Sequence, residues 1–397
     1  MISASLIKQK AAELADELLH IRRHLHKNPE LSFQEFKTSS YLKSQLEKSG
    51  LSRFENKAGT GFTLTISGKN PESKTIALRA DMDALPIQEE NDKPYTSQNP
   101  GVMHACGHDV HSACLWGAAT LLNQLKDNFE GTIKLLFQPG EELLPGGASL
   151  MIADGALEHP KPQQIIGQHV MPFLPVGTVG FRSGLYMASS DEIYIKIKGK
   201  GGHGAMPHLS NDPVPVAAQV ILALQQLVSR KANPLMPSVL TIGKVEAAGA
   251  TNVIPQEVNM QGTFRTLDET WRAEAHRLIE NCIKHTAEAW GMEAELEIRK
   301  GYPFLKNDEE LTGIAKQAAI DYLGAEKVID LDIWMASEDF AYYSQVMPAC
   351  FYRLGVRNEE KGIIHGVHHP KFDIDEQALE IGAGLMAWIA LRALETK

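Results

Sequence analysis

The chain has 397 residues, more than one domain usually holds, and its hydrophobic fraction of 43% supports large buried cores. Asp and Glu total 49 against 39 for Lys and Arg, and the net charge of −10 argues against nucleic acid or anionic membranes as general partners. No apolar run is long enough to span a bilayer, the first residues lack a signal-peptide pattern, and four cysteines do not make a disulfide scaffold. We therefore expect a two-domain cytoplasmic protein with free thiols.

The N-terminal residues predict two helices. Apolar residues recur at helical spacing over 14–25, and this helix should end before Asn28, which precedes a proline. Ser32 and Glu35 form a capping-box pattern that predicts the start of a second helix. Gly50 is suited to end that helix.

Two strands should follow, over residues 62–66 and 75–80. The second is an almost continuous apolar run, as expected of a strand covered on both faces. It leads directly into Asp81 and Asp83. Acidic residues just past the carboxyl end of such a strand occupy the usual ligand-binding edge of an α/β sheet.

The stretch Met-His-Ala-Cys-Gly-His-Asp-Val-His, residues 103–111, is the most informative in the chain. A turn ahead of a helix can aim Cys106 and His108 at one point, and Asp109 suits the N-cap of that helix. Thiolate and imidazole at this spacing are ligands for zinc or a similar divalent metal. The alternative is a polar helix start in which Cys106 is a small buried hydrophobe.

Further candidate ligands follow two more expected strands. A helix over 110–125 and a strand over 132–137 lead to Glu141 and Glu142. Two adjacent carboxylates after Pro-Gly cannot share one direction, so one could bind metal while the other faces a substrate. A solvated turn with a chance acidic pair is the alternative. His169 comes next, and we expect it at the end of another strand.

The pattern changes near residue 189, where apolar and polar residues alternate over 193–197 as in a strand with one wet face. The segments that follow are His203 between glycines, a helix over 213–230, strands over 238–246 and 257–266, a helix over 268–290 and a strand over 293–299. This β-α-β-β-α-β order is that of a ferredoxin-like domain. We expect it to occupy 188–300 as an insertion between two parts of a catalytic domain, 1–187 and 301–397.

The last segment returns to an α/β pattern, with a helix over 309–322, a strand over 351–354 and a long final helix. Ser337-Glu338-Asp339 either lines the site or starts a helix. The residues gathered as candidate ligands and acid–base groups are Asp81, Asp83, Cys106, His108, Glu141, Glu142, His169 and His368. This set suffices for two metal ions with a carboxylate left for proton transfer, which is the chemistry of amide or ester hydrolysis.

These residues resemble the aminoacylase and carboxypeptidase family of dinuclear metallopeptidases, peptidase family M20, and within it the amidohydrolase branch. That branch contains N-acyl-amino-acid amidohydrolases, hippurate hydrolases and auxin-conjugate hydrolases. The resemblance covers nearly the whole chain and is carried by the runs at 23–31, 79–86, 103–111, 137–142, 202–208 and 368–370. It implies a zinc-exopeptidase-like α/β domain with a mostly parallel sheet, and an inserted ferredoxin-like domain for dimerisation.

The resemblance also implies roles for individual residues. The implied metal ligands are Cys106, His108, Glu142, His169 and His368, and they would hold two divalent ions, zinc or manganese, with cobalt or nickel also open. Glu141 would be the general base, and Asp83 a carboxylate that supports the ligands. The wider family has His in place of Asp81, so the bridging ligand and any contact of Asp81 with metal stay open. His369, beside His368, is a further candidate.

In the inserted domain, the resemblance implies that His203 reaches the active site of a partner chain in a homodimer or a dimer of dimers. Asn252 and Arg265 would hold the carboxylate of the substrate. The expected activity is hydrolysis of N-acyl-L-amino acids to a carboxylic acid and a free amino acid. The alternatives are a dipeptidase or aminopeptidase on the same scaffold, and a metal-dependent binding protein that has lost catalysis.

Several other residues have simpler explanations. His104 and His111 are expected to hold the turn around Cys106. The remaining cysteines, Cys114, Cys282 and Cys350, lie in apolar patterns typical of a core.

Overall fold

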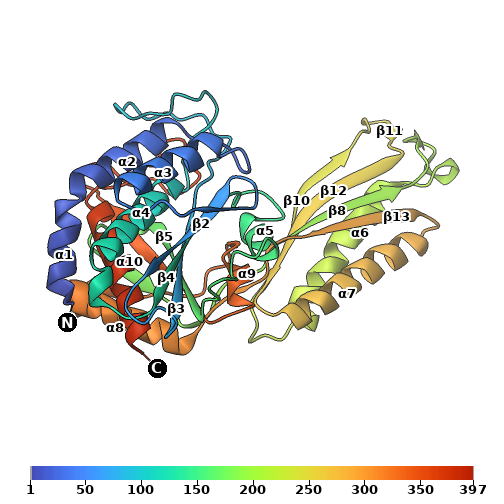
Figure 1. Ribbon diagram of the computed structural model, residues 1–397. Helices are drawn as coiled ribbons and strands as arrows, with labels where there is room; N and C mark the ends of the chain where they lie inside the picture. The colour runs from blue at the N-terminus through green and yellow to red at the C-terminus, as the bar shows by residue number, and fades with distance from the viewer. Residues whose placement is uncertain (1, 397) are drawn as a thin grey trace. The chain divides into compact units, whose positions relative to one another are not determined.

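The computed structural model describes residues 2–396, and the chain divides into two compact units (Figure 1). The first unit contains Met1–Gly184, Lys306–Ile333 and Asp339–Lys397. The second contains Leu185–Leu305 and Trp334–Glu338. Most of the second unit is thus inserted in the sequence of the first, and the short segment Trp334–Glu338 joins it from later in the chain. Among residues 2–396, no helix is both long and apolar enough to cross a membrane.

The first unit is built on an eight-stranded sheet whose central strands run parallel. In spatial order the strands are β1 (Glu55–Lys57), β2 (Gly61–Ser67), β4 (Thr132–Gln138), β3 (Thr75–Asp81), β5 (Gln164–Pro175), β16 (Ala349–Arg357), β6 (Val179–Phe181) and β15 (Val328–Asp330). Every residue of β3 and β4 is buried. Their apolar sequences follow from this burial, and the predicted α/β fold with a mostly parallel sheet is confirmed.

Helices of the first unit are α1 (Ala4–Glu13), α2 (Ala15–Lys27), α3 (Phe36–Lys48), α4 (His108–Gln124), α5 (Gly147–Ala153), α8 (Glu309–Leu323), α9 (Ala341–Ser344) and α10 (Ala378–Glu395). α4 and α10 are apolar on nearly all sides because both are buried, against each other and against β3. α4 starts at the carboxyl end of β3, where the hydroxyl of Ser112 donates to the carbonyl of Asp81 at 2.7 Å. The polar residues at the start of α4, within the stretch 103–111, therefore lie at the carboxyl end of β3.

The predicted start of the second helix is wrong. α3 begins at Phe36, and no side chain caps it. The two residues of the expected capping box are used elsewhere, because the Ser32 hydroxyl donates to Asp83 at 2.6 Å and the Glu35 carboxylate accepts from the amide of Gly140 at 2.8 Å. Both partners are distant in sequence, so a local pattern could not reveal them.

The second unit has a four-stranded antiparallel sheet in the order β10-β12-β8-β13. Its elements are β8 (Asp191–Lys198), β9 (Gly202–His203), α6 (Pro213–Gln226), β10 (Ser238–Ala247), β11 (Val253–Ile254), β12 (Glu257–Thr266), α7 (Glu269–Glu288) and β13 (Glu293–Lys300). A π-helical turn, Leu227–Lys231, extends α6, and the short strands β7 (Gly184–Met187) and β14 (Leu305–Asn307) flank the unit in sequence. The predicted ferredoxin-like order is observed.

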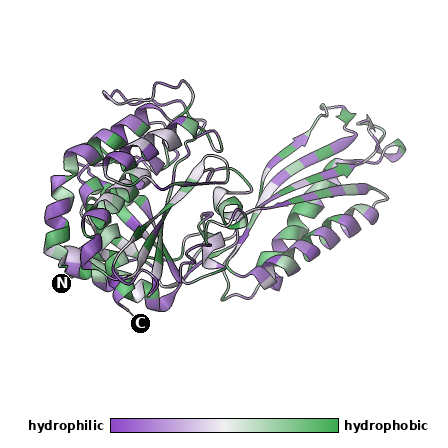
Figure 2. Cartoon of the chain, in the orientation of Figure 1, coloured by the Kyte–Doolittle hydropathy of each residue, from purple (hydrophilic) through white to green (hydrophobic). Residues whose placement is uncertain are grey.

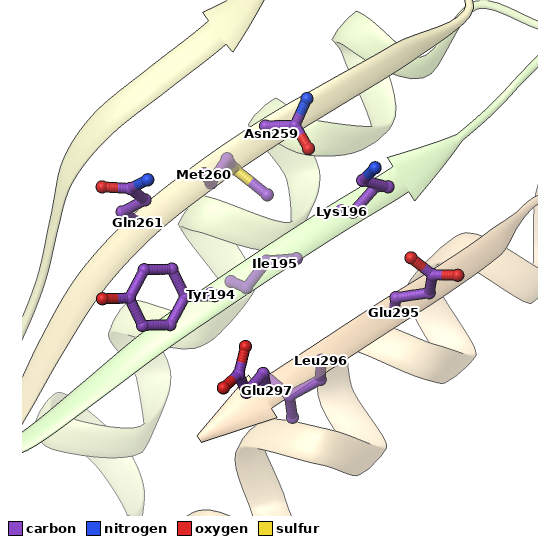
Figure 3. Close-up of a pocket in the computed structure, with 9 residues that line it drawn as sticks. All are labelled: Tyr194, Ile195, Lys196, Asn259, Met260, Gln261, Glu295, Leu296 and Glu297. Carbon is purple, nitrogen blue, oxygen red and sulfur yellow. The ribbon is translucent and has the colours of Figure 1, made fainter. Parts of the chain in front are cut away.

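The sheet of the second unit has one apolar and one polar face, as the alternation over 193–197 predicts. Ile193, Ile195 and Ile197 are buried in a core that α6 and α7 share. Figure 3 shows the opposite face, where Tyr194, Lys196, Asn259, Gln261, Glu295 and Glu297 line a shallow pocket. The same alternation appears as hydrophilic and hydrophobic bands along these strands in Figure 2.

Candidate metal centre

The chain turns sharply between Cys106 and His108, and glycine makes this turn possible. Gly107 has a φ of +85°, a conformation that residues with a side chain rarely adopt. A Cβ at this position would also lie 2.6 Å from Cγ2 of Val170. The side chains of Cys106 and His108 therefore leave the same tight turn, and both are buried.

Asp109 does not cap α4, so that prediction is wrong. The N-cap is Gly107, and Asp109 lies buried in the first turn. Its Oδ2 accepts hydrogen bonds from Nε of Arg22 at 2.9 Å and from Nδ1 of His26 at 2.8 Å. Burial alone would raise the pKa of Asp109, but the charges of Arg22 and His26 lower it far below its ordinary value. Asp109 thus links α4 to α2.

His169 faces Cys106 from β5, with its Nε2 3.4 Å from Sγ. Nδ1 of His169 lies 2.7 Å from the carbonyl of Val170, which can only accept, so Nδ1 carries the proton and Nε2 has a free lone pair. Burial lowers the pKa of His169 well below its usual value, so the ring is neutral. A neutral imidazole is the form that binds metal. His169 lies in the middle of β5 and not at its end as predicted, because β5 continues to Pro175.

Within the described part of the chain, Nε2 of His108 has no hydrogen-bond partner, and it faces a carboxylate oxygen that also has none. Its Nδ1 lies 3.1 Å from Oδ1 of Asp83, which fixes the ring and directs Nε2 at the site, where a metal could replace a proton on that nitrogen. Within residues 2–396, Nε2 of His108 and Oε1 of Glu142 are both buried and accept no hydrogen bond, and they lie 3.9 Å apart. Buried polar atoms are almost always satisfied. A divalent cation fits here, because both atoms would become its ligands.

His368 approaches the same carboxylate from the C-terminal segment, with Nε2 3.3 Å from Oε1 of Glu142. Its backbone has a φ of +63°, which costs energy for a residue other than glycine, and its N–H donates to the carbonyl of Ala105 at 2.7 Å. His369 points elsewhere, since its Nδ1 accepts from the amide of Lys371 and its ring stacks on His365. The structure thus brings His368 to the site and leaves His369 outside.

The two adjacent glutamates diverge, as the Pro-Gly turn before them suggested. Glu142 faces His108 and His368, whereas Oε1 of the buried Glu141 accepts from the amide of Asp339 at 3.3 Å. Overlapping groups bring the predicted ligands together, with ligand atoms within 4.8 Å of one another: Cys106, His108 and His169; Cys106, Glu142 and His368; His108, Glu141 and Glu142.

The electrostatics of the site favour a bound cation. Burial and the charges of Glu142 and Glu141 raise the pKa of the Cys106 thiol well above its usual value. Burial would lower the pKa of His108, but Asp81 and Asp83 raise it to about 10. Without a metal, protons on these two groups balance the carboxylates. A divalent metal would displace those protons and supply the positive charge itself.

His111 and Asp81 support the site without an obvious ligand role. The amide of Val170 donates to Nε2 of His111 at 2.9 Å, so the other nitrogen carries the proton and donates to Oδ1 of Asp81 at 2.6 Å. No lone pair of His111 remains for a metal. Oδ2 of Asp81 accepts from Nη1 of Arg79 at 2.7 Å and lies 3.8 Å from Nε2 of His108. His104 is buried, and burial lowers its pKa to about 4.

The three candidate residues of the second unit lie in two places. His203 on β9 pairs with Val253 on β11, and the carbonyl of Asn252 accepts from the amide of Gly204 at 2.8 Å. Glu257, the first residue of β12, pairs with Lys198 a few residues before β9, whereas Arg265 lies about 26 Å farther along β12 at 3.3 Å per residue. A single pocket within this unit therefore cannot hold all three side chains.

His203 and Arg265 each have a group suited to an anionic partner. The amide of Ala205 donates to Nδ1 of the exposed His203 at 3.1 Å, so Nε2 carries the proton and can donate. Among the described residues, nothing accepts from Nη1 of Arg265, although it is buried. A substrate carboxylate would supply that acceptor.

Comparison with known proteins agrees with this geometry. Residues 77–392 match the model of peptidase family M20/M25/M40. The chain is 42% identical to N-acetyl-L-cysteine deacetylase of Bacillus subtilis, over 92% of this chain and 85% of the relative. It is 44% identical to N-acyl-L-amino acid amidohydrolase of Geobacillus stearothermophilus, over 76% and 81% of the two chains. The solved structure of the Bacillus subtilis YXEP protein, a dinuclear metal binding peptidase, superposes with a TM-score of 0.83 at 34% identity and covers 97% of this chain and 100% of that one.

Proposed function

Because this chain belongs to peptidase family M20/M25/M40 and is an amidohydrolase, we propose that its substrates are N-acyl-L-amino acids, which it hydrolyses to a carboxylic acid and a free amino acid. The observation that carries the proposal is the pair of buried, unsatisfied atoms, Nε2 of His108 and Oε1 of Glu142, beside the Cys106–His169 pair. Cys106, His108, Glu142, His169 and His368 would hold two divalent ions. Zinc, manganese, cobalt and nickel all accept this mixed set of donors.

When bound, the metals would polarise the amide carbonyl and lower the pKa of a water molecule. The chain's own residues complete the chemistry. Glu141 accepts a proton from the attacking water and delivers it to the nitrogen of the leaving amine. Asp83 keeps the Nε2 lone pair of His108 directed at the site, through the hydrogen bond to Nδ1. Nε2–H of His203 donates to the oxyanion as the carbonyl carbon becomes tetrahedral. Asn252 and Arg265 lie in two places on the second unit, so we propose that they hold the substrate carboxylate from different chains of the dimer, with Asn252 entering beside His203.

We propose that the chain acts as a homodimer, or a dimer of dimers, joined through its second unit. Large apolar side chains on that unit are exposed, among them Leu222 at 70% and Leu235 at 87%. Burial of such side chains against a second chain would remove apolar surface from water. The cysteines are free thiols, which suits the reducing cytoplasm that we propose as the location.

Substrate class is tested with acetyl, benzoyl, indoleacetyl and succinyl derivatives of one amino acid, alongside dipeptides with a free α-amine. We expect release of the free amino acid from at least one acyl derivative, detected by its new primary amine. Dipeptides should not be cleaved, because their α-amine is charged where the acyl group of a substrate is neutral. Cleavage of dipeptides alone would make the protein a dipeptidase.

Cys106→Ala should reduce both metal content and activity, because a thiolate donor disappears from the site. Cys114→Ala is the matched control, since Cys114 is equally buried on α4 but contacts the carbonyl of Leu379 and no candidate ligand. Elemental analysis of the two purified variants compares their metal content. Full metal content in Cys106→Ala would remove this residue from the ligand set.

A further inference from the structure

Two buried carboxylates hold the backbone on either side of Glu141. The amide of Gly140 donates to Oε1 of Glu35 at 2.8 Å, and the amide of Glu142 donates to Oδ2 of Asp83 at 2.9 Å. Glu35 and Asp83 belong to different segments of the first unit, and neither side chain is exposed. The peptide groups that flank Glu141 are therefore fixed from both directions.

Gly140 has no freedom to compensate for a lost contact. It has a φ of +57°, and a Cβ there would lie 2.3 Å from Cε1 of Phe33. Its carbonyl accepts from the amide of Gly147 at 2.9 Å, so both of its backbone polar groups are engaged. The hydrogen bond from Gly140 to Glu35 thus sets the direction in which the chain enters Glu141.

Glu35 is buried, and removing its carboxylate from water costs free energy that its contacts must offset. Three donors converge on its carboxylate: the amides of Phe33 and Gly140, each 2.8 Å from Oε1, and the hydroxyl of Thr60, 2.5 Å from Oε2. No Lys, Arg or His of residues 2–396 forms an ion pair with it. Burial accordingly raises the pKa of Glu35, although its hydrogen bonds oppose that shift. Burial of a carboxylate without a cation costs free energy, and one of the three hydrogen bonds that offset this cost also fixes the peptide of Gly140.

We propose that Glu35 is a positioning residue that aims the carboxylate of Glu141 at the attacking water. The inference rests on the proposed role of Glu141 as general base. Glu35 acts through the Gly140 peptide and touches neither metal nor substrate. A displacement of about 1 Å in a reacting group can cost about 10²-fold in rate, so the placement of this peptide matters to turnover.

The test compares Glu35→Met with Glu30→Met. Methionine matches the length of glutamate but offers no strong acceptor. Glu30 lies in the same loop, and its carboxylate accepts from the amide and hydroxyl of Thr38 without contacting Gly140. We expect Glu35→Met to keep its metal and its KM while kcat falls about 10- to 100-fold. Glu30→Met should change kcat by less than about 3-fold, because the hydrogen bond from Gly140 to Glu35 stays in place in this variant.

A conservative variant and a second readout separate positioning from general stability. Glu35→Gln should retain most of kcat, because its carbonyl can accept from Gly140 while its amide donates to the Thr60 hydroxyl. In metal-free protein, hydrogen exchange at the Gly140 amide should be faster in Glu35→Met and unchanged in Glu30→Met. If Glu35→Met does not fold, Glu35→Asp takes its place, since the shorter side chain withdraws from Gly140.

In a Glu141→Gln background, the Glu35 substitution should cause no further loss, because both changes disable the same group. An unchanged kcat in folded Glu35→Met, or an equal loss with and without Glu141, would overturn the role of Glu35. A fully active Glu141→Gln would instead overturn the proposed general base. The two failures are therefore distinguishable.

Discussion

Glu141→Gln should lower kcat by about 10²- to 10⁴-fold while metal content and KM stay close to those of the unaltered protein. Glutamine has the size of glutamate but cannot accept a proton at neutral pH. Its amide oxygen can still accept from the amide of Asp339, so the surrounding structure should persist. Steady-state kinetics at saturating metal, with elemental analysis of the same samples, measures both effects.

The adjacent glutamate supplies the control. Glu142→Gln should weaken metal binding, because Oε1 of Glu142 is the buried oxygen that faces His108 and His368. Its activity should return in part when excess metal is added, which Glu141→Gln should not permit. If Glu141→Gln loses metal and Glu142→Gln keeps it, the roles of the two carboxylates are reversed.

The second large effect concerns His203. His203→Ala should lower kcat by about 10²- to 10³-fold, the typical loss when one hydrogen-bond donor to an oxyanion is removed. The amide of Ala205 donates to Nδ1, so Nε2 carries a proton and can donate to the oxyanion. His203→Gln, which keeps a donor, should recover part of the rate. Metal content should not change in either variant, because no candidate ligand group found within residues 2–396 includes His203.

A mixing experiment decides whether His203 acts in the active site of its own chain or in that of the partner chain. A His203→Ala chain and a Glu141→Gln chain are combined under conditions that allow subunits to exchange. If His203 acts across the dimer, each heterodimer has one site with both defects and one site with neither. Activity should then rise above that of either variant alone. Heterodimers proven by mass spectrometry but without recovered activity would place His203 in its own chain's site or outside the mechanism.

The regular elements could be predicted because their signals are local. A mostly apolar run is enough to predict β3 and β4, since neither face of a strand covered on both sides contacts solvent. The alternation at Ile193, Ile195 and Ile197 predicted the half-covered sheet of the second unit. The Cys106 turn could also be predicted as a metal-binding motif. A thiol and an imidazole on either side of a glycine form a ligand pattern within three consecutive residues.

The errors share one cause, which is that a polar residue can serve a partner far away in the chain. Ser32 and Glu35 formed a capping pattern, yet they bind Asp83 and Gly140. Asp109 suited an N-cap, but its carboxylate accepts a hydrogen bond from Arg22 of α2 instead. No pattern within a few residues distinguishes these uses, because the competing donors come together only on folding.

The sequence by itself determined which residue types were available: ligands at the ends of buried strands, two adjacent carboxylates, and an inserted unit of β-α-β-β-α-β order. The tertiary structure decided which of them meet. It turned Nε2 of His108 toward Oε1 of Glu142, engaged both nitrogens of His111, and brought His368 rather than His369 to the centre. It also assigned Glu35 to the Gly140 peptide. The physical reason is that ligand geometry depends on lone-pair directions and backbone contacts set by packing, whereas residue identity and periodicity depend on the chain alone.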